Sequence, residues 1–243
     1  MANFEAIYNT DLIYQSDCWK LCGDAHCCTF GRHKARFKLI GRMSAQELPL
    51  LPGEHEFLIE SGLIDSFAEH SHRCVEFRFG DHRLMIESLV IKEAICACRH
   101  DARTTVCRLY PVLPVFDIGG RMIGIDKLGI YDQLEAMDGA ASICQIKSVP
   151  LTELPKLLAI GQAIASDPRS LFYVTAYHLA QSHVIRQVEM FLQTVESGGR
   201  PDPFRAFETL LLRQKAINTG EFETELINLA ERFTARYGDA FRL

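Results

Sequence analysis

The sequence lacks the features that mark membrane-spanning and nucleic-acid-binding proteins. No apolar run approaches the ~20 residues that a transmembrane helix requires, and no tract of lysine and arginine points to nucleic acid. Charged residues make up 23% of the chain, hydrophobic residues 48%, and the formal net charge is -5, which is ordinary for a soluble globular protein. We therefore predict a globular protein with neither a membrane nor a nucleic-acid partner.

Signatures of several enzyme classes are also missing. No glycine-rich phosphate loop follows a predicted strand, and the pair Gly119 and Gly120 is better explained as a turn. No Gly-x-Ser-x-Gly nucleophile elbow occurs. The Cys-x3-Cys-x2-Cys spacing of radical S-adenosylmethionine enzymes is matched by Cys18 and Cys22 but fails at Ala25, where its third cysteine would stand. These classes are therefore not expected.

Cysteine is abundant, with nine residues in 243. This number is odd, and the chain opens Met-Ala-Asn-Phe-Glu-Ala, without the basic and apolar regions of a secretory signal. Both observations favour a reducing, cytoplasmic location. In that compartment, clustered cysteines more often bind metal or carry out redox chemistry than form disulfides.

Seven of the cysteines form two blocks that predict a metal site. The candidate ligands are Cys18, Cys22, Cys27 and Cys28 in the first block, and Cys96, Cys98 and Cys107 in the second. Thiolates are soft ligands that suit zinc, iron and iron-sulfur clusters. Because one tetrahedral zinc takes four ligands, seven thiols include spectators, or serve two sites, or hold a cluster. The sequence predicts zinc or iron as cofactor and leaves these arrangements open.

Other ligand-type residues carry weaker signals. His26, beside the Cys-Cys pair, is either a ligand, a hydrogen-bond donor to one, or an exposed loop residue. His70, His72 and Cys74 alternate, so they would share one face of a strand, but without a partner nearby in sequence we expect a solvated loop over His70 and His72. Cys74 and Cys144 are expected to be ordinary small hydrophobic residues.

Two hairpins are predicted in the first part of the chain. Residues 74–87 alternate apolar and polar side chains around a Gly-Asp turn at 80–81. Residues 114–126 repeat this pattern around Gly119 and Gly120. These segments predict a small antiparallel β element that presents the second cysteine block from its connections.

Shorter segments precede the first hairpin. Residues 4–14 are apolar enough to form a short strand or turn over the metal loop. The Ser-Ala-Gln-Glu pattern at 44–47 fits the capped start of a helical turn, cut short by the prolines that follow. Residues 54–63 are expected to form a short helix that ends near Gly62.

From residue 152 onward the sequence becomes helical. Asp167-Pro168 and Asp202-Pro203 each place a capping residue before a proline at the first helical position. We predict an α+β fold in which a small antiparallel β element with a cysteine metal cluster precedes a helical C-terminal region. Residues 1–150 form the cysteine-cluster metal-binding region, and residues 151–243 form a helical region packed on it.

The two cysteine blocks together resemble the YkgJ-like (CxxCxxCC) cysteine-cluster family of zinc- or iron-chelating proteins. The resemblance rests on an early group ending in Cys27 and Cys28, and on a later string, Arg103 to Pro111, similar to the family's Arg-Pro-x-x-Cys-Arg-x-Phe-Pro. Thr104 stands where the family usually has proline. Flagellin lysine-N-methylases are similar in having an early cysteine group and a later Cys-x-x-Tyr-Pro, here Cys107 to Pro111.

Three functions follow as hypotheses. The first is a metal-binding protein that holds zinc or iron, or an iron-sulfur cluster, with clustered thiolates. The second, implied by the likeness to the methylases, is a metal-dependent or metal-stabilised enzyme that modifies a protein or peptide, such as a lysine N-methylase. The third is an interaction module whose C-terminal helices bind a protein or peptide partner.

Overall fold

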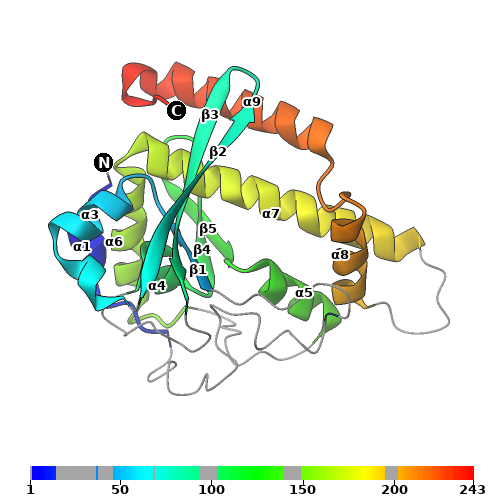
Figure 1. Cartoon of the computed structure of the whole chain (residues 1–243), viewed down its shortest axis with the longest axis horizontal. Helices are drawn as coiled ribbons and strands as arrows, with labels where there is room; N and C mark the ends of the chain where they lie inside the picture. The colour runs from blue at the N-terminus through cyan, green and yellow to red at the C-terminus, as the bar shows by residue number, and fades with distance from the viewer. Residues whose placement is uncertain are drawn as a thin grey trace.

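The computed structural model describes residues 2–14, 37, 46–67, 69–92, 103–139, 149–194 and 202–243. Figure 1 shows two small antiparallel sheets surrounded by helices, with the last part of the chain entirely helical. The predicted α+β class is therefore confirmed. Within the described residues, no helix is both long and apolar enough to cross a membrane.

The first sheet contains β1 (Gln46–Leu50), β2 (His70–Phe79) and β3 (His82–Ile91) in the order β1-β3-β2. Strands β2 and β3 form the first predicted hairpin, which is longer than the sequence indicated because residues 70–73 continue the pairing. The solvated loop expected over His70 and His72 was therefore wrong. Backbone pairing with β3 makes this segment a strand instead.

Strand β1 corrects a second expectation, because residues 46–50 are not a helical turn. They pair along β3, which buries Leu48 and Leu50 beside Leu89. Pro49 is tolerated because β1 is an edge strand. Burial of an apolar strand face therefore outweighed the local helix-capping pattern.

The second sheet is the predicted hairpin of β4 (Val112–Phe116) and β5 (Met122–Lys127). Asp117 organises its turn, since its Oδ1 accepts hydrogen bonds from the backbone amides of Gly119 (2.9 Å) and Arg121 (3.0 Å). Gly120 has φ 82°, a conformation that glycine adopts without strain.

Short helices lie between the strands. They are α1 (Phe4–Tyr8), α3 (Glu54–Glu60), the 3-10 turn η3 (Leu63–Ser66) and α4 (Thr105–Leu109). The helix predicted over residues 54–63 is confirmed and ends before Gly62, which has φ 71°. The strand or turn expected in residues 4–14 begins instead with helix α1, because the Asn3 side chain caps it by accepting from the Ala6 amide (3.0 Å).

The later helices are α5 (Ile130–Asp138), α6 (Leu154–Ala165), α7 (Pro168–Thr194), α8 (Pro203–Leu212), α9 (Thr219–Tyr237) and the 3-10 turn η4 (Gly238–Ala240). Both predicted caps are confirmed. Asp167 Oδ2 accepts from the Ser170 amide (3.1 Å), and Asp202 Oδ1 accepts from the Phe204 amide (2.9 Å).

The main core joins strands and helices from both parts of the chain. Phe79 at the end of β2 packs on Phe172 of α7, and the ring of Phe172 meets that of Phe233 on α9 edge-on. Figure 1 shows the β2–β3 hairpin running across α7 with its tip at α9. At that tip the Gly80 amide donates to Glu223 Oε1 (3.4 Å), so α9 supports the hairpin at its turn.

Candidate functional site

Of the seven thiols predicted to bind metal, only Cys107 lies in the described part of the chain. The other six, Cys18, Cys22, Cys27, Cys28, Cys96 and Cys98, lie outside the described residues, as do His26 and Cys144. Cys74 lies in β2, as expected, but its side chain is exposed, so it is not the buried small hydrophobic residue that the sequence indicated.

Cys107 is a free, half-buried thiol on helix α4. The Thr104 hydroxyl begins this helix by accepting a hydrogen bond from the Cys107 amide (3.4 Å). The side chain of Cys107 packs against the apolar cluster between α3 and the first sheet, in which Leu58 is fully buried. The thiol is therefore partly accessible to a ligand.

A buried carboxylate, Glu54, fixes the backbone on which Cys107 sits. Its Oε1 accepts from the Tyr8 hydroxyl (2.7 Å) and from both the amide (2.6 Å) and the hydroxyl (2.8 Å) of Thr105. Its Oε2 accepts from the Leu51 amide (2.8 Å). Burial raises the pKa of Glu54, while these hydrogen bonds act in the opposite direction. One side chain therefore ties α1, α3 and α4 together.

Arginines complete this support. The Arg108 guanidinium lies 4.5 Å from the centre of the Tyr8 ring, a cation–π contact, and its Nε donates to the Arg103 carbonyl (2.9 Å). Burial raises the pKa of Tyr14, and the nearby Arg103 guanidinium lowers it. In the sequence, Tyr14 precedes the first cysteine block and Arg103 precedes Cys107.

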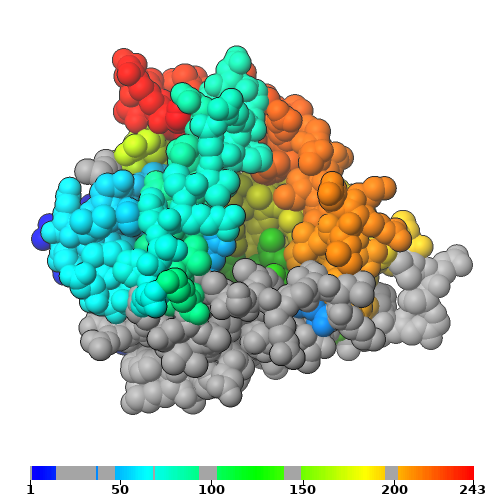
Figure 2. Space-filling view, viewed as in Figure 1, coloured from blue at the N-terminus to red at the C-terminus, as the bar shows by residue number. Residues whose placement is uncertain are grey.

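An apolar cavity of about 530 Å³ lies beside the same helix. It is enclosed by the first sheet, α4, β4, α7 and α9, and among its lining residues are Phe77, Leu84, Val106, Leu109, Leu113, Tyr173, Tyr177 and Leu226. Figure 2 shows the molecule hollowed between the β2–β3 hairpin and the α8–α9 region. Val106 and Leu109 belong to α4, so the helix that presents Cys107 also forms part of the cavity wall.

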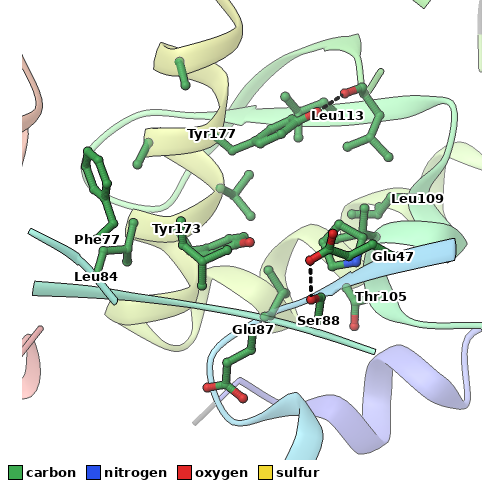
Figure 3. A pocket seen from close by; sticks show the side chains of 18 of the residues that line it. Glu47, Phe77, Leu84, Glu87, Ser88, Thr105, Leu109, Leu113, Tyr173 and Tyr177 are labelled. Atoms are coloured by element: carbon green, nitrogen blue, oxygen red, sulfur yellow. Dashed lines mark hydrogen bonds between the residues drawn. The ribbon is translucent and has the colours of Figure 1, made fainter. Parts of the chain in front are cut away.

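Few polar groups reach the cavity. Ser88 donates to Glu47 Oε1 (2.8 Å), and the Tyr177 hydroxyl donates to the Leu128 carbonyl (2.7 Å), as Figure 3 shows for the first pair. Burial raises the pKa of Tyr177 to about 12 and raises that of Tyr173 as well, so both phenols are protonated at neutral pH. Such a cavity suits an apolar group with few polar atoms.

A third constellation joins α3 to the β2–β3 hairpin. The rings of His55 and His72 stack with centroids 3.7 Å apart and an interplanar angle of 12°. His72 Nε2 lies 3.1 Å from Glu87 Oε2, and one ligand atom from each of the three residues lies within 4.8 Å of the others. The alternation of His70, His72 and Cys74 was noted in the sequence but interpreted as a solvated loop, and nothing in the sequence linked His72 to His55 or Glu87.

Comparison with family models, with curated proteins and with solved structures gave no match for this chain. The functional argument therefore depends on the fold and on the residues just described. They define an α+β protein with an apolar cavity beside an accessible thiol, and with a separate imidazole and carboxylate group on its sheet.

Proposed function

We propose that the protein binds zinc or iron through the thiolates of its two cysteine blocks, with Cys107 as a ligand from the second block. The ligands are drawn from Cys18, Cys22, Cys27, Cys28, Cys96, Cys98 and Cys107. Thiolates in this number suit a zinc site or an iron-sulfur cluster. A reducing, cytoplasmic location keeps them available as ligands.

The observation that carries the proposal is the contact between α1, which precedes the first block, and α4, which holds Cys107 of the second. The Tyr8 ring lies 4.5 Å from the guanidinium carbon of Arg108, the residue after Cys107. The end of α1 is therefore held against α4 beside Cys107.

The metal content of anaerobically purified protein tests this proposal, with the two described thiols as a matched pair. We expect zinc or iron in the wild-type protein and in Cys74→Ser, and a large loss of metal in Cys107→Ser. Absorbance from sulfur-to-iron charge transfer would specify an iron-sulfur cluster. Equal metal in both variants, or neither metal in the wild-type protein, would overturn the proposal.

The cavity favours a second function, in which the protein is an enzyme that modifies a protein or peptide. Its volume of about 530 Å³ accepts an apolar side chain beside α4, and a metal held by Cys107 would lie close to that helix. A lysine N-methylase is one such enzyme, because the aliphatic stem of lysine suits an apolar, tyrosine-lined wall.

Transfer of a labelled methyl group to candidate proteins tests this alternative. Ala180 lines the cavity, so Ala180→Phe should fill part of it and abolish transfer, whereas Ala159→Phe on the exposed face of α6 should leave transfer unchanged. Wild-type protein that transfers no label above the buffer control would remove the methylase alternative.

A further inference from the structure

His55, His72 and Glu87 are brought together by three different elements. His55 lies in the first turn of α3, and the two other side chains project from β2 and β3 toward that helix. Glu87 also borders the cavity, but in Figure 3 its carboxylate points away from the other lining side chains. The group is also distinct from Cys107, which lies on α4.

The separations suit one ion. Two ligand atoms about 2.1 Å from a tetrahedral zinc lie about 3.4 Å apart. His72 Nε2 and Glu87 Oε2 are already 3.1 Å apart, and the upper limit of 4.8 Å within the group leaves side-chain rotation to bring His55 into range. No movement of a strand or helix is needed.

The supporting structure is rigid. Glu87 sits on β3, the central strand of its sheet, and His72 on the neighbouring β2. Helix α3 is held by the four hydrogen bonds to Glu54, directly before His55, and by the fully buried side chain of Leu58. Ligands on paired strands and an anchored helix lose little freedom when an ion binds.

The charges around the group also favour a cation. Glu56 and Glu87 both act electrostatically on His55, so two carboxylates face the imidazole pair. His70 is the other histidine that acts on His55, and Cys74, opposite Glu87 in the strand register, lies outside the set of three ligand atoms.

We propose that His55, His72 and Glu87 form a binding site for a divalent transition-metal ion of the Zn²⁺ class, separate from the thiolates. Two imidazole nitrogens select such ions over Mg²⁺ and Ca²⁺, which prefer oxygen ligands. Three protein ligands leave a coordination position for water or a small anion. The side chains of His72 and Glu87 are 31% and 16% exposed, so this position opens to solvent.

Cobalt titration of the full-length protein, retaining whatever metal it carries from purification, tests the site. We expect one equivalent of Co²⁺ to bind with the ligand-field absorption of nitrogen and oxygen ligands, without sulfur-to-cobalt charge transfer, and to be displaced by Zn²⁺. The variants His55→Asn, His72→Asn and Glu87→Gln should each weaken binding at least about a hundredfold, because even lost outer-shell partners cost about 10- to 100-fold.

The same hairpin supplies matched controls. His82→Asn and Glu76→Gln change a histidine and a glutamate of β3 and β2 that lie outside the group, so Co²⁺ affinity should be unchanged. Far-ultraviolet circular dichroism checks that each variant keeps its fold. Equal binding by His72→Asn and His82→Asn would overturn the proposal, and so would a charge-transfer band that disappears in Cys74→Ser or Cys107→Ser.

This test is independent of the thiolate proposal. Metal that co-purifies with the protein reports on the cysteine blocks, whereas added Co²⁺ reports on His55, His72 and Glu87. Protein purified without metal would defeat the first proposal and leave the titration readable, because thiolate and imidazole ligation give different spectra.

Discussion

The two groups of candidate ligands are assembled in opposite ways. The thiols are gathered along the sequence, and the fold's contribution is to hold Cys107 on α4, against Tyr8 of α1. The imidazoles and carboxylate are scattered along the sequence, and the packing of α3 on the first sheet brings them together. Clustering in sequence therefore makes the first group visible before the fold is known, whereas the second group is visible only in the folded protein.

Both groups depend on Glu54, which lies next to His55 and hydrogen-bonds the helix of Cys107. Of the changes considered, replacing Glu54 with alanine should have the largest effect on stability and on both groups. It leaves the Tyr8 hydroxyl and the Thr105 and Leu51 amides without their acceptor. We expect a loss of about 3 kcal/mol in the free energy of unfolding, measured by denaturant titration, and weaker metal binding at both groups.

Glu60→Ala provides the control for this prediction, since Glu60 is exposed at the other end of α3. Its free energy of unfolding should stay within about 0.5 kcal/mol of the wild-type value. If the Glu54 variant matched this control, Glu54 would not be the shared support of the two groups.

Arg108 separates the groups, because it supports only the thiol. Arg108→Met keeps much of the side-chain volume but removes the contact with the Tyr8 ring and the hydrogen bond to the Arg103 carbonyl. The expected cost is about 1–2 kcal/mol of unfolding free energy, together with reduced co-purifying metal and unchanged Co²⁺ affinity at His55, His72 and Glu87.

An exposed arginine gives the comparison for this measurement. Arg83 lies 3.8 Å from Glu76 with its side chain 64% exposed, so Arg83→Met should change the unfolding free energy by less than about 0.5 kcal/mol. A parallel loss of Co²⁺ binding in the Arg108 variant would show that the two groups are not separate.

The smallest expected effect is a pH dependence confined to the imidazole group. Burial lowers the pKa of His55 from its ordinary value of 6.5, and the neighbouring His72 lowers it further. Below pH 6.5 the unfolded chain takes up a proton at His55 that the folded protein resists, so stability falls as pH decreases toward the folded pKa. Metal-free His55→Gln should lose this part of the pH dependence.

Unfolding free energies of metal-free protein at about pH 7.5 and about pH 5.5 measure the effect. His82→Gln, on the same hairpin, should retain the wild-type difference between the two pH values. An identical difference in the wild-type and His55→Gln proteins would mean that burial does not bias His55 toward its neutral form.

Local signals in the sequence predicted much of the fold. The turns at Gly80 and at Gly119–Gly120 located both hairpins, and the Asp-Pro pairs located the starts of α7 and α8. The helical turn predicted in place of β1 was wrong, because this segment forms a strand only by pairing with β3, more than thirty residues later in the chain. A capping pattern is a local property of the sequence and carries no information on a strand partner so far along the chain.

The candidate sites were less predictable. Cys107 was singled out from its neighbours in sequence, but its support by Glu54 and Tyr8 was not, because three separated elements meet there. His55 gave no signal, since a single histidine in a short helix has no periodic pattern. The cavity wall was equally hidden, because Phe77 and Tyr173 come from a strand and a helix far apart in the chain.

The alternation of side chains along β3 has a consequence for the whole surface of the protein. All three of Ile86, Glu87 and Ser88 border the cavity, but the Glu87 carboxylate points away from the other lining side chains and lies beside His72. A slip of one residue in the pairing of β3 would exchange the two sides, turning the Glu87 carboxylate toward the cavity and away from the imidazoles. Because β3 is hydrogen-bonded along both edges, by β1 and by β2, its alignment is determined twice. The strand pairing that forms the sheet therefore also keeps the apolar cavity lining separate from the imidazole and carboxylate group.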